Sequence, residues 1–204
     1  MLKRAMDVIG AVAGLLVLSP VLAVVALLVR WRLGRPVLFR QERLGLHEQP
    51  FQLIKFRTMI DARGPDGTLL PDADRLTPLG RRLRASSLDE LPELWNIVRG
   101  EMSLVGPRPL PTGYRHRYRP PERARHQVRP GVTGWAQVRG RNTVDWDERL
   151  AMDVWYVRNR TLWLDLRILL RTVVAVLTRR GIMAEGEATM RVLRPEVAES
   201  ADDP

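Results

Sequence analysis

Two adjacent carboxylates, Asp89 and Glu90, are the residues of this sequence best placed to do chemistry. They lie in the stretch SLDELPELWN, residues 87–96, at the expected start of a helix. A serine followed three residues later by a glutamate is the capping-box pattern, and acidic side chains near a helix N-terminus suit the helix dipole. The same pair could instead hold a hard metal ion such as Mg²⁺, or supply a nucleophile aimed at phosphorus.

Pro92 limits the explanation by capping alone. If Ser87 is the N-cap, Pro92 is the fifth helical residue and forfeits the hydrogen bond to the Leu88 carbonyl. If Asp89 is the N-cap, Pro92 falls in the first turn, where proline is tolerated. Asp89 then stands at a positively polarised helix end that suits anions. Capping and catalysis are therefore compatible.

Arginines framed by glycine and proline indicate bound phosphate. Arg108 lies in the stiff turn GPRP, residues 106–109, and the constrained loop 129–135 precedes Arg139 and Arg141. Guanidinium groups pair with phosphate oxygens through two parallel hydrogen bonds. Each arginine alone is weak evidence, but rigid arginines near paired carboxylates favour a phosphorylated substrate.

The overall composition also favours an anionic partner. The 204 residues include 33 Lys and Arg against 23 Asp and Glu, a formal net charge of +10. No cysteine is present, which excludes disulfides and thiolate metal sites, and the three histidines lack the spacing of zinc ligands. The sequence contains neither a GxxxxGK[ST] nor a GxGxxG motif, so P-loop and dinucleotide-binding folds lose their main support.

The N-terminal segment is predicted to enter a membrane. Residues 8–29 carry no charge, and the run is long enough to span a bilayer. Ser19-Pro20 near its middle predicts a kink, where the Ser19 hydroxyl can bond the freed backbone. Basic residues on both sides keep both flanks on the cytoplasmic side under the positive-inside preference. These features favour a re-entrant helix-break-helix; a straight transmembrane helix and a cleaved signal peptide are the alternatives.

Other elements must position the charged residues. Two strands are expected, over Pro36–Arg43 and over Pro50–Thr58, and the second carries Lys55 and Arg57. We also expect a surface loop over 61–75, a short basic helix over Thr77–Arg84, a helix that follows Ser87 and ends at Gly100, and a helix over Thr161–Arg180. The last of these is either a core helix or an amphipathic helix at the membrane surface.

Several stretches resemble the bacterial sugar transferases, the monotopic phosphoglycosyl transferases that start glycoconjugate assembly on a polyprenol phosphate carrier. The resemblance runs from the first residues to about residue 190, and residues 86–109 form its longest and most specific block. The stretches that carry it are KRAMD (3–7), the Ser19-Pro20 break, PVLFRQERLG (36–45), KFRTM (55–59), SSLDELPELWNIVRGEMSLVGPRP (86–109), RPGVTGWAQVRGRN (129–142) and DVWYV (153–157).

The resemblance implies a monotopic membrane protein of mixed α/β (α+β) class. A re-entrant membrane hairpin would occupy residues 1–34, a small cytoplasmic catalytic domain with interfacial helices residues 35–190, and a disordered tail residues 191–204. The protein would lie in the bacterial inner (cytoplasmic) membrane, in contact with membrane lipids, with its catalytic domain on the cytoplasmic face.

The resemblance also implies a ping-pong reaction. Asp89 would attack the β-phosphate of a UDP-sugar and expel UMP, and undecaprenyl phosphate would then take the phosphosugar from the aspartate. Mg²⁺ held by Asp89 would neutralise the diphosphate, and Glu90 would be the base or the positioning group for the lipid phosphate. This would be the first membrane step towards an exopolysaccharide, O-antigen, capsule or glycoprotein glycan.

Further site residues follow from the same resemblance. Substrate contacts are expected from Lys55, Arg57, Arg108, Arg139 and Arg141, and Asp153 would orient one of these groups. A structural salt bridge is the alternative for such a charged residue.

The predicted sugar and the rival functions rest on fewer residues of the sequence. Residues 181–190, GIMAEGEATM, resemble short members that use UDP-linked N-acetylated amino sugars, so such a sugar is predicted, with galactose or glucose left open. A homodimer is compatible with the sequence. One rival is a catalytically inactive scaffold of the glycan pathway, against which the intact Asp89-Glu90 pair argues. The other is a membrane-tethered nucleic-acid binder, but no recognition motif is present and no nucleic acid is expected as partner.

Overall fold

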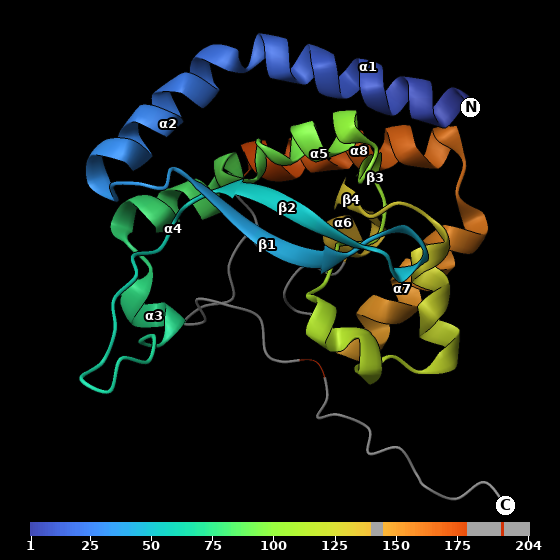
Figure 1. Cartoon of the computed structure of the whole chain (residues 1–204). Helices are drawn as coiled ribbons and strands as arrows, with labels where there is room; N and C mark the ends of the chain where they lie inside the picture. Colours follow the sequence, from blue (N-terminus) through green and yellow to red (C-terminus); the bar gives the residue numbers. More distant parts are fainter. Residues whose placement is uncertain (140–144, 179–192, 194–204) are drawn as a thin grey trace, which may run out of the picture.

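The computed structural model describes residues 1–139, 145–178 and 193, and its architecture is mixed α/β, as predicted (Figure 1). The described α-helices are α1 (Leu2–Val17), α2 (Ser19–Arg32), α3 (Asp72–Arg75), α4 (Pro78–Ala85), α5 (Glu93–Arg99), α6 (Trp135–Arg139), α7 (Trp146–Asn159) and α8 (Leu162–Leu177). The described strands are β1 (Leu38–Leu44), β2 (Pro50–Phe56), β3 (Ser103–Val105) and β4 (Gly131–Thr133). Short 3₁₀ helices are η1 (Leu46–Glu48), η2 (Leu88–Glu90), η3 (Thr112–Arg117) and η4 (Pro120–Gln127).

The first two helices form a bent pair along one edge of the molecule (Figure 1). Their axes differ by 63° at a break before Ser19. Pro20 has no N–H to give to the Leu16 carbonyl, and the Ser19 hydroxyl donates to that oxygen instead, at 2.8 Å. The predicted helix-break-helix is therefore confirmed. No single described helix is long and apolar enough to cross a membrane, whereas this bent pair passes the same test of length and composition.

Helix α1 packs closely on α5 and β3 through its small residues. A Cβ atom added at Gly10 would lie 2.8 Å from Leu104 Cδ1, and one added at Gly14 would lie 3.1 Å from Leu94 Cδ1. Ala11, between these glycines, is fully buried in the apolar core that α1 shares with β2 and α5. The absence of larger side chains brings the helix backbone close to the rest of the protein, so the N-terminal hairpin and the remainder share one core.

The β1–β2 hairpin is antiparallel and lies beneath the bent helix pair (Figure 1). Asn96 of α5 is fully buried and bonds the backbone of β2. Its Oδ1 accepts from the Ile54 N–H at 3.1 Å, and its Nδ2 donates to the Gln52 carbonyl at 2.7 Å. These bonds fix α5 against β2 and bring the residues just before α5 next to that strand.

Strands β3 and β4 pair in parallel, which the sequence analysis did not predict. Each strand has three residues, too few to show an alternating pattern. A Cβ atom at Gly131 would lie 2.1 Å from the Gly106 N, so both glycines serve a close approach of two backbones. The pair links the GPRP turn to the loop before α6.

Most predicted elements are present, with shifted ends. The predicted strands correspond to β1 and β2, and the predicted helices to α4, α5 and α8; Gly100 ends α5 in a left-handed conformation, as expected. The expected loop over 61–75 ends in the short helix α3. Arg141, residues 181–190 and most of the predicted tail lie outside the described residues. Leu193 is described, and it is fully buried beside Leu44 and Leu150.

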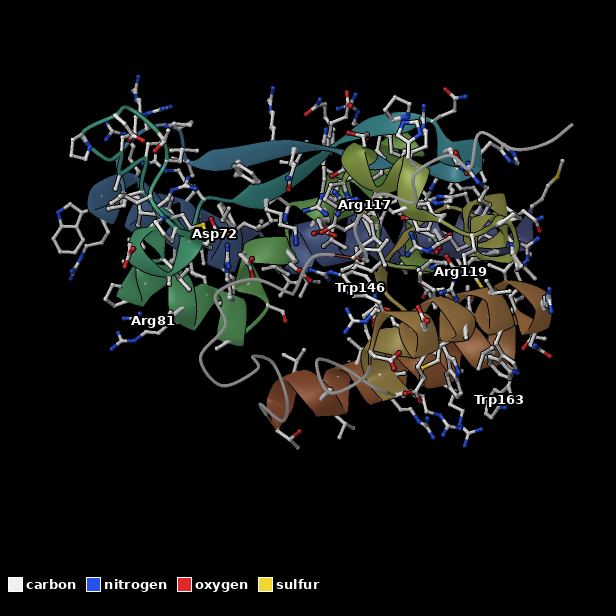
Figure 2. The ribbon with its side chains drawn as sticks, turned by 90° about the horizontal axis from the view of Figure 1, so that it is seen from below. Asp72, Arg81, Arg117, Arg119, Trp146 and Trp163 are labelled. Atoms are coloured by element: carbon white, nitrogen blue, oxygen red, sulfur yellow. The ribbon has the colours of Figure 1, made fainter. Side chains whose placement is uncertain are left out.

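Helix α8 has an apolar side that the protein does not cover. Asp165 and Ile168 are buried, while Leu166, Leu170 and Val173 are exposed. Figure 2 shows Trp163 of α8, 71% exposed, at the margin of the molecule away from the β1–β2 hairpin. The helix is thus amphipathic, with a polar contact inside and apolar side chains outside, as an interfacial helix would be.

A buried polar network ties the start of α1 to the remainder of the protein. Asp7 accepts hydrogen bonds from the Ser103 hydroxyl at 2.8 Å and from the Leu104 N–H at 3.0 Å. Lys3 donates to Asp165 of α8 at 2.6 Å and lies 3.7 Å from Asp7. The network therefore joins α1, β3 and α8, three elements far apart in the sequence.

Replacing Asp7 with alanine should destabilise the protein. The substitution leaves the part-buried Leu104 N–H without its acceptor and leaves the buried Ser103 hydroxyl only the Val105 carbonyl, at 3.0 Å. A buried polar group left unsatisfied costs about 1–3 kcal/mol. Thermal unfolding in nanodiscs measures the effect. Asp61→Ala is the control, because the Asp61 side chain is 70% exposed and lies 3.7 Å from Arg75. Equal melting temperatures for the two variants would contradict this role of Asp7.

Candidate active site

The Asp89-Glu90 pair lies in the 3₁₀ turn η2, and the α-helix begins only at Glu93. Pro92 is the N-cap residue of α5, so both capping alternatives for Ser87 and Asp89 are wrong. Ser87 has a φ of 56°, a left-handed conformation unlike the extended one of an N-cap, and its side chain makes no capping hydrogen bond. Proline lacks an N–H, so it stands where the chain changes from the 3₁₀ turn to the α-helix.

Glu90 is held by two of the predicted substrate-binding residues. Its Oε1 accepts from Lys55 Nζ at 2.7 Å and from Arg108 Nη2 at 2.6 Å. Lys55 comes from β2 and Arg108 from the GPRP turn after β3, so these two segments meet the 3₁₀ turn that carries Glu90 at one carboxylate oxygen. Burial raises the pKa of Glu90, but the charges of Arg108 and Lys55 outweigh it and hold that pKa well below its usual range. Glu90 is therefore ionised and fixed.

Asp89 is buried beside this cluster but is not bonded into it. Its residue is 6% exposed, and no residue in the described part of the chain donates a hydrogen bond to its carboxylate. Burial and the charge of Glu90 raise the pKa of Asp89 to about 6, against the opposing charges of Lys55 and Arg84. At neutral pH Asp89 is thus an ionised carboxylate with no bonded partner among the described residues. The neighbouring Glu90 is also ionised, but it is held by Lys55 and Arg108.

A third carboxylate, Glu93, belongs to the cluster and was missed by the sequence analysis. Its Oε1 lies 3.0 Å from Lys55 Nζ, so one ammonium group bridges Glu90 and Glu93. Burial raises the pKa of Glu93 to about 7, with Lys55 opposing and Glu90 adding to the rise. The spacing Glu90-x-x-Glu93 across a turn was the available signal. For Lys55, burial lowers the pKa, but Glu90 and Glu93 outweigh it and raise the pKa.

Asp153 supports the site from behind rather than lining it. It is buried in α7 and pairs with the buried Arg125, whose Nη2 lies 2.8 Å from Asp153 Oδ2. The same Nη2 donates to the backbone carbonyl of Arg108 at 2.7 Å. The pair thus fixes the backbone of the turn that presents Arg108 to Glu90. Arg125 was missed because nothing distinguishes it among the many arginines of residues 113–129.

The other predicted substrate-binding residues are not in this cluster. Arg57 donates to the backbone carbonyls of Met59 at 2.9 Å and Arg35 at 2.8 Å. Arg139 is exposed and lies over the ring of Trp135, 4.6 Å from its centroid. Arg141 lies outside the described residues.

A small, partly open pocket lies beside the ion cluster. It is lined by Arg43, Leu53, Lys55, Glu93, Arg108 and Pro109. Three of these residues carry positive charge, so the pocket suits a small anion such as a phosphate group. Arg43 is a further residue that the sequence analysis did not single out.

The carboxylates offer limited ligands for a metal. Within the described residues, no group of three or more Asp, Glu, His or Cys side chains is arranged to hold one ion. Mg²⁺ usually takes one or two protein carboxylates and completes its shell with water and substrate phosphates. Asp89, free and ionised, fits that role, whereas Glu90 is engaged by Lys55 and Arg108.

Comparison with known proteins places this sequence in a family. A sequence model described as bacterial sugar transferase matches residues 1–179. The chain belongs to that family. Among its relatives, an uncharacterized sugar transferase, EpsL, of Bacillus subtilis is 47% identical over 188 residues, which are 92% of this chain and 93% of the relative. The match thus covers almost the whole of both proteins.

Other relatives of this sugar transferase carry names that state an activity. The UDP-glucose:undecaprenyl-phosphate glucose-1-phosphate transferase of Caulobacter vibrioides is 47% identical over 86% of this chain and 70% of its own length. The undecaprenyl-phosphate galactose phosphotransferase of Salmonella typhimurium is 38% identical over 88% of this chain but 41% of its own length. The chain therefore spans most of the first two relatives and about two-fifths of the third. Its family and the activities named for these relatives show that it is an enzyme.

Replacing Arg125 with methionine should destabilise this sugar transferase strongly. The substitution leaves the buried Asp153 carboxylate without its partner, and breaking a buried ion pair in this way costs about 3–5 kcal/mol. Arg99→Met is the matched control: Arg99 is about half exposed and lies 3.2 Å from Glu101, so its loss costs about 0–1 kcal/mol. Denaturant unfolding in detergent compares the two, and equal midpoints would contradict the role of the Arg125–Asp153 pair.

Replacing Glu93 with glutamine should change how stability depends on pH. The pKa of Glu93 rises from 4.5 to about 7 on folding, so between these values the folded protein retains a proton that the unfolded chain has lost. Glu93 therefore makes wild-type stability fall as the pH rises through this range, and Glu93→Gln lacks that fall.

The measurement is the melting temperature of each protein at pH 5 and pH 8. The melting temperature of Glu93→Gln minus that of wild type should be larger at pH 8 than at pH 5. Glu42→Gln, on the exposed side of β1, should show the same difference from wild type at both values. If Glu93→Gln behaves as Glu42→Gln does, the buried carboxyl does not titrate as stated.

Proposed function

We propose that this chain moves a sugar-1-phosphate from a UDP-sugar to undecaprenyl phosphate and releases UMP. The observation that carries the proposal is the contrast within the Asp89-Glu90 pair: one carboxylate is free and ionised, and the other is locked between Lys55 and Arg108. The printed activities of the Caulobacter and Salmonella relatives support the same chemistry.

In the first half of the reaction the Asp89 carboxylate attacks the β-phosphorus of the UDP-sugar. The bond from that phosphorus to the oxygen bridging the two phosphates breaks, UMP leaves, and the phosphosugar is carried on Asp89. In the second half an oxygen of the lipid phosphate attacks the same phosphorus and displaces Asp89. One phosphoanhydride replaces another, so catalysis needs positioning and charge stabilisation rather than an added energy source.

The remaining charges have distinct parts in this reaction. A carboxylate with a pKa as low as that of Glu90 is a poor base, so Glu90 acts by positioning Lys55 and Arg108 towards the phosphates. Mg²⁺ held by Asp89 would stabilise the charge of the diphosphate and of the leaving UMP. The Arg125–Asp153 pair keeps the backbone of Arg108 in place.

The bent helix pair and α8 support a place for the enzyme at a membrane surface. We propose that α1 and α2 dip into the cytoplasmic leaflet of the bacterial inner membrane and return, since both ends are basic and the segment between them is apolar. The exposed apolar side chains of α8 would rest on the same leaflet. A site held there meets a soluble nucleotide sugar and a lipid headgroup.

The sugar stays a prediction. The relatives' names give glucose, galactose and N-acetylgalactosamine, so the family uses both plain hexoses and N-acetylated amino sugars. An N-acetylated amino sugar for this chain rests on residues 181–190, which lie outside the described residues. The homodimer likewise stays a prediction.

Replacing Asp89 with asparagine should abolish UMP release. The test uses full-length protein in nanodiscs with undecaprenyl phosphate, Mg²⁺ and a panel of UDP-sugars that includes UDP-glucose, UDP-galactose and UDP-N-acetylgalactosamine. Loss of the nucleophile should lower the rate by about a thousandfold or more. Asp74→Asn, an exposed residue of α3, should keep the wild-type rate.

A covalent intermediate gives the second measurement. With UDP-sugar labelled in the sugar and no lipid acceptor, the label should stay on denatured wild-type protein and be absent from Asp89→Asn. Equal UMP release by wild type and Asp89→Asn would overturn the mechanism. A folded wild-type protein that releases no UMP and retains no label from any sugar would favour the inactive scaffold.

A further inference from the structure

Arg43 is a cation of the site that has no counter-ion among the described residues. It lies on β1 and lines the small pocket together with Lys55, Arg108 and Glu93. Its Nη2 donates to Gln41 Oε1 at 2.6 Å, and its Nη1 donates to the Pro109 carbonyl at 3.3 Å. Both acceptors are neutral, and in the described part of the chain no carboxylate lies within ion-pair distance of Arg43. Its guanidinium is thus held in place without being neutralised.

The other arginines that share this environment are paired. Arg108 is bonded to Glu90, and Arg125 is bonded to Asp153. Glu90 and Glu93 do lie near Arg43, but Lys55 and Arg108 already occupy them. Burial and the neighbouring charge of Arg108 lower the pKa of Arg43 to about 10, the direction expected for a cation that lacks compensation.

The Arg43 side chain also has an unused donor. Its Nε is buried and has no hydrogen-bond partner in the part of the chain that the structure describes. Leaving a buried donor of a charged group unsatisfied is costly, and a protein tolerates it where a ligand supplies the acceptor. A phosphate group offers several acceptor oxygens and negative charge at once, and it pairs with the planar guanidinium through two bonds.

We propose that Arg43 binds a phosphate group of a substrate, in the pocket that it shares with Lys55 and Arg108. This inference rests on the proposed function and adds to it a residue and a place. Two sources supply this chemistry, the diphosphate of the nucleotide sugar and the phosphate of the lipid acceptor. Asp89 does not line the pocket, so Arg43 acts by holding the anion beside the reacting carboxylate and is no part of the covalent step.

The test compares three variants in full-length protein in nanodiscs. Arg43→Gln removes the charge, Arg43→Lys keeps a charge, and Arg40→Gln removes an exposed arginine from the same strand. In a ping-pong reaction the kcat/KM for each substrate reports only on its own half-reaction. We expect Arg43→Gln to lower one of the two kcat/KM values about tenfold to a hundredfold, Arg43→Lys to restore part of it, and Arg40→Gln to change neither.

The substrate that is affected identifies the source of the phosphate. A fall confined to the UDP-sugar assigns the pocket to the nucleotide diphosphate, and a fall confined to undecaprenyl phosphate assigns it to the lipid. Unchanged kcat/KM values for both substrates in Arg43→Gln would overturn the proposal.

A binding measurement separates this proposal from the reaction mechanism. UMP and inorganic phosphate are titrated by calorimetry into Asp89→Asn protein, with and without Arg43→Gln, so that no turnover is needed. The proposal predicts that Arg43→Gln weakens the binding of at least one of these anions about tenfold or more. If Arg43 only supports Pro109, Arg43→Gln lowers the melting temperature while both anions bind the folded protein within about twofold of the control, and the proposal fails.

Discussion

Lys55 holds Glu90 and Glu93 together, and the geometry of the site depends on this contact and on its continuation through Arg108. The three charged segments come from β2, from the turn before α5 and from the turn after β3. Buried charges are stable only when they are paired and hydrogen-bonded, so each member fixes the others. Asp89 is the carboxylate left outside these ion pairs among the described residues, which is the arrangement that the proposed nucleophile requires.

The N-terminal hairpin is part of the framework that holds this cluster. Helix α1 packs through Gly10, Ala11 and Gly14 on the same α5 and β3 that flank the charged residues, and Asp7 bonds the backbone of β3 directly. The orientation of the hairpin and the position of the GPRP turn are therefore fixed by one core. If the hairpin enters a membrane as proposed, this rigid link would let its depth set the height of the site above the membrane.

The distribution of charge separates positioning from reaction. The net charge of +10 is gathered in part around one small pocket, whose lining holds three cations, Arg43, Lys55 and Arg108, and one carboxylate, Glu93. Such an excess is stable only while it is small, and a bound anion removes it. The names of these relatives give different sugars but the same lipid phosphate, undecaprenyl phosphate. This arrangement would suit enzymes that bind the same phosphate groups but different sugars.

The sequence by itself determined the local features of this protein. The break at Ser19-Pro20, the strands around Lys55 and the end of a helix at Gly100 all follow from the properties of neighbouring residues. The catalytic role of the adjacent Asp89 and Glu90 stays a prediction. It misplaced the start of α5, because the left-handed Ser87 and the 3₁₀ turn depend on contacts with β2 and α4.

Only the tertiary structure decided which charges meet. Glu93, Arg43 and Arg125 look like ordinary surface residues along the chain, and three-residue strands such as β3 and β4 leave no periodic signal. Arg57 and Arg139 looked as suitable as Arg108, yet the fold brings Arg108 alone of these three to Glu90. Pairing between segments 18 to 66 residues apart is set by packing of the whole chain, and no local pattern encodes it.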